Sequence, residues 1–178
     1  MSKRINCGEF TEQGTTYRVT AYLELVQLEG NKYPYFAVTG HVDEKEILST
    51  GDFYYRNYLT GCCHKDILKT EKGKGLKDII RMHLANINGV PHGAFANGWW
   101  FLHGADEYEK EHEVKVEDKK YYTDEFIADH LRVPIEDIPE IRKLSKEEFK
   151  QFVEEQKPRW KKEADEIIKK YKLTIEYR

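Results

Sequence analysis

The sequence predicts an α+β protein, with a small antiparallel β-meander packed against a helical layer and followed by a helical C-terminal region. Apolar residues alternate with polar ones through residues 16–26, which is the period of a half-buried strand. From Leu76 onward they recur instead at i, i+3, i+4 and i+7, the period of an amphipathic helix. A chain of 178 residues is expected to form one domain. We divide it into the meander (1–60), a Cys/His helical core module (61–104) and a charged connection with C-terminal helices (105–178).

The meander is expected to need support from helices. Residues 1–14 are polar and are expected to be a loose lead-in. Pro34 stands near the start of the second strand, where proline is tolerated. A bare hairpin is only marginally stable, so one face of this sheet should be covered by a helical layer. The expected strands are 16–26, 33–42 and one or two within 47–58, joined by turns at 29–32 and 43–46.

The helices are predicted from their periods and from their end signals. Asn88-Gly89 is typical of a helix end, and Pro91 fits the first position of a new helix. Residues 105–120 are dense in charge and are expected to be an exposed loop or an edge hairpin. The expected helices are 62–69, 76–87, 92–102, 124–131 and 145–170.

The C-terminal helices carry the clearest capping signals. Thr123 is placed to cap the helix that follows it, with acidic residues in the first turn. Ser145 and Glu148 form a capping-box pattern at the start of the last helix. Pro158 lies inside that helix and is expected to kink or split it.

Composition excludes several classes of protein. The net charge of −3 gives no global basic footprint for nucleic acid. No run approaches the ~20 apolar residues of a membrane span, and the N-terminal segment is too polar for a signal peptide. Three cysteines, two of them adjacent, do not make a disulfide framework. We therefore expect a cytoplasmic protein in a reducing compartment, with no membrane contact and with its thiols free or on a metal.

A cluster of cysteines and histidines in residues 61–104 predicts a metal site. Cys62, His64, His83 and His92 could hold a structural zinc ion, because zinc prefers four such ligands in a tetrahedron. Cys63 could take the place of Cys62. The alternative is that the cysteines are small apolar fillers and that His83 is a core histidine bonded to backbone.

The same cluster supports a second hypothesis, a thiol-dependent catalytic site. Cys62 stands where a helix is expected to begin, and helix N-termini lower the pKa of a thiol. His83 or His92 could act as the base, with Asn97 orienting it. This arrangement would make the protein a small metal- or thiol-dependent hydrolase or nuclease.

A third hypothesis is a binding surface. Trp99 and Trp100 could stack on a ligand or a base, and Lys65, Lys69 and Arg81 could contact phosphate. The alternative is that Trp100 caps the core, Trp99 is half exposed and the basic side chains are simply solvated.

Two runs of residues resemble a family of small uncharacterised proteins of bacteriophages and mobile elements. The first reads G-C-x-H from Gly61, H-L at His83, N-G-x-P from Asn88 and A-x-A-N-G-W from Ala94. The second reads F-V-x-x-Q-x-P-R-W-x-x-E-A-D from Phe152. The family has Pro-Met-His-Ala where this chain has Pro-His-Gly-Ala, so the histidine is displaced by one residue.

The resemblance implies a context and no reaction. It implies an accessory protein made inside a bacterial host, whose partner is a host protein or ribonucleoprotein. Proteins of this kind often act on host defence, including CRISPR systems. Direct nucleic-acid binding remains an alternative.

Overall fold

The computed structural model describes residues 3–12, 14–42, 45–48 and 85–178 and shows an α+β fold. Its sheet has the strand order β1-β2-β3-β4, with antiparallel neighbours, and β5 pairs in parallel with β2. The predicted fold class is therefore confirmed. The strands are β1 (Lys3–Glu12), β2 (Thr15–Gln27), β3 (Tyr35–Val42), β4 (Lys45–Leu48) and β5 (Ile175–Tyr177).

The first strand was not expected, and the prediction of a loose lead-in over residues 1–14 is wrong. β1 pairs antiparallel with β2 from end to end. Its apolar residues Ile5, Cys7 and Phe10 do not keep a period of two, because a bulge between Asn6 and Gly8 shifts the register. The bulge therefore hid the strand from a search for strict alternation.

The second strand follows the prediction closely. Leu23 and Leu25 are buried, while Glu24 between them is half-exposed. The parallel pairing of β5 with Leu25–Gln27 was not predicted, and it makes the sheet mixed. An ion pair between Arg178 Nη2 and Glu24 Oε2, at 2.8 Å, holds the C-terminal strand against β2.

The predicted helices 62–69 and 76–87 fall outside the described residues, except for the last three residues of the second. Residues 85–87, the predicted end of a helix, pair with the start of β3 instead: Phe36 N donates to Ala85 O at 2.9 Å and Ile87 N to Pro34 O at 2.8 Å. Pro91 does not begin a helix, since α2 starts three residues later. The helices are α2 (Ala94–Trp99), a π-helical segment (Trp100–Gly104), α3 (Ala105–His112), α4 (Asp124–Leu131), α5 (Ile138–Arg142), α6 (Lys146–Tyr171) and 3-10 turns at Glu117–Tyr121 and Ile135–Asp137.

The charge-dense stretch is largely helical, so the prediction of an edge hairpin over residues 105–120 is wrong and that of a loop holds for residues 113–116 alone. α3 continues α2 without a break through the π-helical segment. Lys119 pairs with Asp106 at 2.7 Å and also with Glu109, which ties the following turn back to α3. Much of the stretch remains exposed, as its composition predicts.

Both predicted caps are present. Thr123 Oγ1 accepts from Phe126 N at 3.2 Å. Ser145 Oγ accepts from Glu148 N at 3.1 Å, and Glu148 Oε1 accepts from Ser145 N at 3.0 Å. The predicted split at Pro158 does not occur, since α6 runs through it as one helix of 26 residues.

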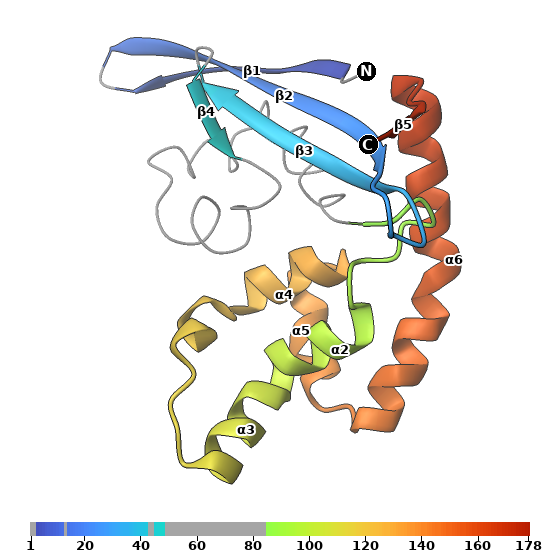
Figure 1. The fold of residues 1–178 in the computed structure, drawn as a ribbon. Coiled ribbons are helices and arrows are strands. Elements are labelled where there is room, and N and C mark those ends of the chain that lie inside the picture. The colour runs from blue at the N-terminus through green and yellow to red at the C-terminus, as the bar shows by residue number, and fades with distance from the viewer. Residues whose placement is uncertain (1–2, 13, 43–44, 49–84) are drawn as a thin grey trace.

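The last helix connects the two parts of the fold (Figure 1). The sheet lies at one end of the molecule, α2 to α5 gather at the other, and α6 runs alongside both. Phe149, Val153 and Trp160 on α6 are buried in the core of the helical part, with Phe126 and Leu131 of α4. None of the described helices combines the length and apolar composition needed to cross a bilayer.

Candidate functional site

A tight turn at residues 86–89 is pressed against α6. Gly89 N donates to Asn86 O at 2.7 Å, and Asn88 N donates to Asn86 Oδ1 at 2.8 Å. Gly89 has a φ of +78°. A Cβ added to it would lie 1.9 Å from Trp160 O, so only glycine allows this approach. The turn therefore has a fixed position relative to α6.

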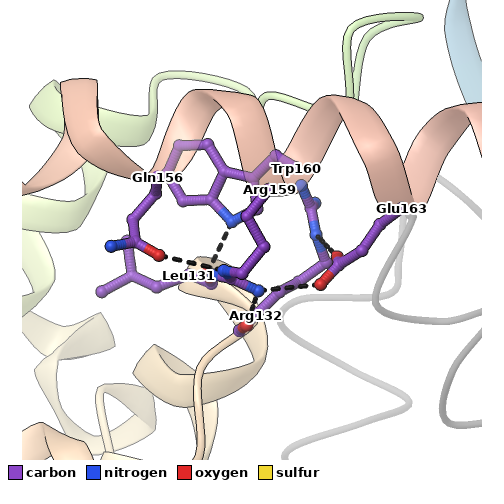
Figure 2. A network of polar contacts seen from close by, with 6 residues as sticks. All are labelled: Leu131, Arg132, Gln156, Arg159, Trp160 and Glu163. Atoms are coloured by element: carbon purple, nitrogen blue, oxygen red, sulfur yellow. Dashed lines mark hydrogen bonds and ion pairs between the residues drawn. The ribbon is translucent and has the colours of Figure 1, made fainter.

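Figure 2 shows how α6 also holds the end of α4. Trp160 Nε1 donates to Leu131 O at 3.0 Å, and Arg159 Nη1 donates to Arg132 O at 2.8 Å. These bonds satisfy carbonyls that the end of a helix leaves without a partner. The backbone of Arg132 adopts the left-handed conformation, with a φ of 52°, and α4 ends there.

A single carboxylate joins the two arginines of this network. Glu163 accepts from Arg132 Nε at 3.2 Å and from Arg159 Nη1 at 2.8 Å (Figure 2). Gln156 Oε1 accepts from Arg159 Nε at 3.0 Å. Arg132 is almost fully buried, so its pairing with Glu163 offsets part of the cost of burying its charge.

Two buried titratable residues lie on α4 beside this network. Burial raises the pKa of Asp129 to about 7. Burial also lowers the pKa of His130 to about 3, helped by the positive charges of Arg132 and His92. The His130 ring packs edge-on against Phe101 at 5.1 Å between ring centres. His130 is therefore neutral at physiological pH and belongs to the core.

A pocket of about 590 Å³ opens between the turn joining β2 to β3 and the segment leading into α2. This volume is in the range of small-molecule sites, roughly 300 to 1,000 Å³. Tyr33 is 42% exposed in it, whereas Pro91 and Ala94 form a buried part of the wall. The lining residues are Leu28, Asn31, Lys32, Tyr33, Tyr35, Asn86, Val90, Pro91, His92, Gly93 and Ala94.

The frame of the pocket is fixed by backbone hydrogen bonds. Asn86 N donates to Val90 O at 3.1 Å, and Ala94 N donates to Pro91 O at 3.0 Å. On the opposite wall, Asn31 N donates to Leu28 O at 3.1 Å. The two walls are joined through residues 85–87, which pair with the start of β3. Hydrogen bonds within the chain therefore hold the backbone of both pocket walls in place.

The side chains in the pocket are aromatic, amide and cationic. Lys32 Nζ lies 5.2 Å from the centre of the Tyr33 ring, so a charge and an aromatic face are presented together. The Asn86 amide uses its Oδ1 on Asn88 N, which leaves its NH₂ group as a donor. Among the described residues that line the pocket, none is acidic. Such a site suits an anionic ligand with a planar part.

The structure places only part of the predicted Cys/His site. His92 is exposed and lines the pocket. Cys62, His64 and His83 lie outside the described residues. Within the described ranges, no group of three or more His, Cys, Asp or Glu side chains could hold a metal ion. The zinc site therefore stays a prediction.

The thiol hypothesis also stays a prediction, since Cys62 and His83 are not described. Asn97, its third member, has a structural contact: Asn97 Nδ2 donates to His92 O at 3.1 Å. Its amide also covers Gly93, where an added Cβ would lie 2.6 Å from Asn97 Nδ2. Asn97 thus holds the segment leading into α2.

The two tryptophans are half-buried and contact different neighbours. Trp99 packs on Phe149 and His103, and its Nε1 donates to Glu107 Oε2 at 3.4 Å. Trp100 Nε1 donates to Tyr122 OH at 3.1 Å. Both rings pack against the helical core, which supports the alternative given for them. Lys65, Lys69 and Arg81, the basic part of that hypothesis, lie outside the described residues.

The pocket residues Lys32, Tyr33 and Asn86 were not singled out in the sequence. The available signal was the run Lys-Tyr-Pro-Tyr from Lys32, which puts a cation and two aromatic residues at a turn. Binding residues lie disproportionately on loops that a rigid scaffold positions. The run was instead interpreted as the start of a strand.

Comparison with known protein families, curated proteins and solved structures finds no match to this chain. The resemblance to phage and mobile-element proteins is therefore still a prediction. Function has to be argued from the chemistry of the site itself.

Proposed function

We propose that this chain is an accessory protein of a bacteriophage or mobile element, and that it acts by binding a host macromolecule. The partner is a host protein or ribonucleoprotein of the defence machinery, such as a CRISPR system. One observation supports a binding role: a preformed, open pocket presents Lys32, Tyr33 and Asn86 on a frame fixed by backbone hydrogen bonds. Exposed aromatic and cationic side chains on a fixed frame are the chemistry of recognition.

Matched variants test this proposal. Tyr33→Ala removes the exposed ring of the pocket, whereas Tyr177→Ala removes a ring that is 77% exposed on β5, outside the pocket lining. Neither ring is buried, so both variants should fold. Tagged wild type and both variants would be recovered from the bacterial host, with bound proteins and RNA quantified. We expect one partner to be retained by wild type and Tyr177→Ala and lost by Tyr33→Ala.

A functional readout makes the test independent of the purification. The same proteins would be expressed in cells that restrict a phage through CRISPR interference, and plaques would be counted. We expect wild type and Tyr177→Ala to restore plaques and Tyr33→Ala to fail. Equal behaviour of the two variants in both assays would refute a binding role for the pocket, and failure of the wild type to restore plaques would refute the CRISPR assignment.

The proposal includes a structural zinc ion held by Cys62, His64, His83 and His92. One thiolate and three imidazoles suit a closed tetrahedral site. Elemental mass spectrometry of the untagged protein should find about one zinc per chain, and chelation should lower the melting temperature. Zinc that leaves the melt unchanged on removal would instead favour the hydrolase or nuclease hypothesis. In that case Cys62→Ser would abolish activity without unfolding the chain.

A further inference from the structure

We infer that the pocket binds a nucleoside phosphate, with the base against Tyr33 and the phosphate on Lys32. The inference takes the same pocket as the proposed function and names the chemical class of its ligand. It follows from which hydrogen-bonding groups the pocket still offers and which it has already used.

Most backbone acceptors of the pocket lining are already occupied. Seven of its carbonyl oxygens accept a hydrogen bond from within the chain. Gln27 Nε2 donates to Asn31 O at 2.5 Å, and Asn97 supplies two further donors, Nδ2 to His92 O and N to Gly93 O. A ligand rich in donors would find few partners here. The occupied carbonyls are those of Leu28, Asn31, Asn86, Val90, Pro91, His92 and Gly93.

Several of the side chains that remain are donors. Lys32 offers an ammonium, and Asn86 offers the NH₂ of an amide whose orientation is fixed by its bond to Asn88 N. The hydroxyls of Tyr33 and Tyr35 have no hydrogen-bond partner among the described residues, and they can donate as well. Together with the lack of a carboxylate in the described lining, this favours a ligand that is anionic and rich in acceptors.

The shape of the site adds a requirement for a planar group. Tyr33 presents an exposed ring, and Leu28, Val90 and Pro91 supply apolar wall. A volume of about 590 Å³ is larger than an inorganic anion needs and suits a ring system with an attached charge. A nucleotide has this combination, since its base can stack on tyrosine while ring nitrogens, carbonyls and phosphate oxygens accept hydrogen bonds.

Binding assays with defined probes test the inference. Isothermal titration would compare the four ribonucleoside monophosphates, adenosine, inorganic phosphate and a short single-stranded RNA. We expect at least one monophosphate to bind about tenfold more tightly than adenosine or phosphate alone, because both halves of the site contribute. If the short RNA binds more tightly than the monophosphates, the natural ligand is an unpaired nucleotide within an RNA. If it does not, the natural ligand is a free nucleotide.

Variants assign the two halves. Tyr33→Ala should weaken binding about tenfold, and Tyr33→Phe should keep it within about twofold, because stacking needs the ring and not the hydroxyl. Lys32→Gln should weaken nucleotide binding and remove its salt dependence while leaving adenosine unaffected. Lys169→Gln, an exposed lysine on α6, is the control and should bind as wild type does.

The outcomes separate this inference from the proposed function. No nucleotide binding at millimolar concentration, or binding that Tyr33→Ala and Lys32→Gln leave unchanged, overturns the inference. If the host partner is nevertheless lost by Tyr33→Ala, the proposed function stands without it. If nucleotides bind through both residues but no host partner depends on Tyr33, the inference stands and the proposed function fails.

Discussion

The contact between the turn at Gly89 and α6 can be tested by one substitution and a matched control. Gly89 and Gly30 both have a positive φ, +78° and +85°. Gly30 has no atom within 4 Å of an added Cβ, whereas Gly89 has Trp160 O at 1.9 Å and Trp160 C at 2.4 Å. Gly30→Ala and Gly89→Ala therefore introduce the same backbone strain, and only the second introduces a clash with α6.

The expected magnitudes follow from these two contributions. Placing alanine in the left-handed region costs roughly 1 kcal/mol, and both variants lose this amount. The overlap at Gly89 involves backbone atoms of a helix, which cannot rotate away, so the turn must lift off α6. Overpacking of this kind costs about 3 kcal/mol more. We expect losses of unfolding free energy of about 1 kcal/mol for Gly30→Ala and about 4 kcal/mol for Gly89→Ala.

Urea denaturation followed by circular dichroism measures both values. The midpoint should fall in each variant while the dependence on urea concentration stays the same, as for a loss of native stability alone. If Gly30→Ala and Gly89→Ala lose the same free energy of unfolding to within about 0.5 kcal/mol, the docking of the turn on α6 is refuted.

Two further predictions concern buried polar groups. The folded pKa of Asp129, about 7, lies above its unfolded value near 4, so the folded state holds an extra proton between these pH values and loses stability as pH rises through them. Asp129→Asn should therefore gain stability over wild type with rising pH, up to about 4 kcal/mol near pH 8 and almost nothing near pH 4, in urea titrations. The lowered pKa of His130 has the opposite effect, because the folded state loses stability as pH falls below about 6.5. In Asp129→Asn only this His130 effect should remain, so its stability should rise with pH. If Asp129→Asn follows the pH profile of the wild type, the raised pKa of Asp129 is refuted. Trp160→Phe removes the donor to Leu131 O and should lower the free energy of unfolding by about 2 kcal/mol. Trp99→Phe removes a longer hydrogen bond to an exposed carboxylate and should lower it by less than about 0.5 kcal/mol. Equal shifts in melting temperature for the two variants would contradict a stabilising role of the buried Trp160 bond.

The elements that the sequence predicted well are those specified by neighbouring residues. The caps at Thr123 and Ser145 depend on contacts three residues away, and β2 alternates in sequence up to Leu25, beyond which Val26 is buried as well. The elements that were missed depend on distant partners. β5 is three residues long, and it forms beside β2 only because α6 returns the chain to the sheet.

The pocket could not be predicted for a similar reason. Its two walls, around Tyr33 and around Pro91, are nearly sixty residues apart in the chain. They meet because residues 85–87 pair with the start of β3, where a continuous apolar period had predicted a helix. Local periodicity cannot detect such a competing backbone partner.

The described part of the first run that carries the family resemblance meets the second run in space, although the two runs start far apart in the chain. Gly89 of the first run lies against Trp160 and Ala164 of the second, and Gly98 packs under Phe149, which precedes the second run on α6. These residues hold α6 against the rest of the helical part, so close packing alone explains why they are glycine, alanine and large aromatic residues. Lys32 and Tyr33 lie outside both runs. Pro91 and Ala94 of the first run form part of the buried pocket wall. A resemblance carried by such runs therefore concerns the scaffold and one wall of the pocket, and two proteins that share it can still differ at Lys32 and Tyr33.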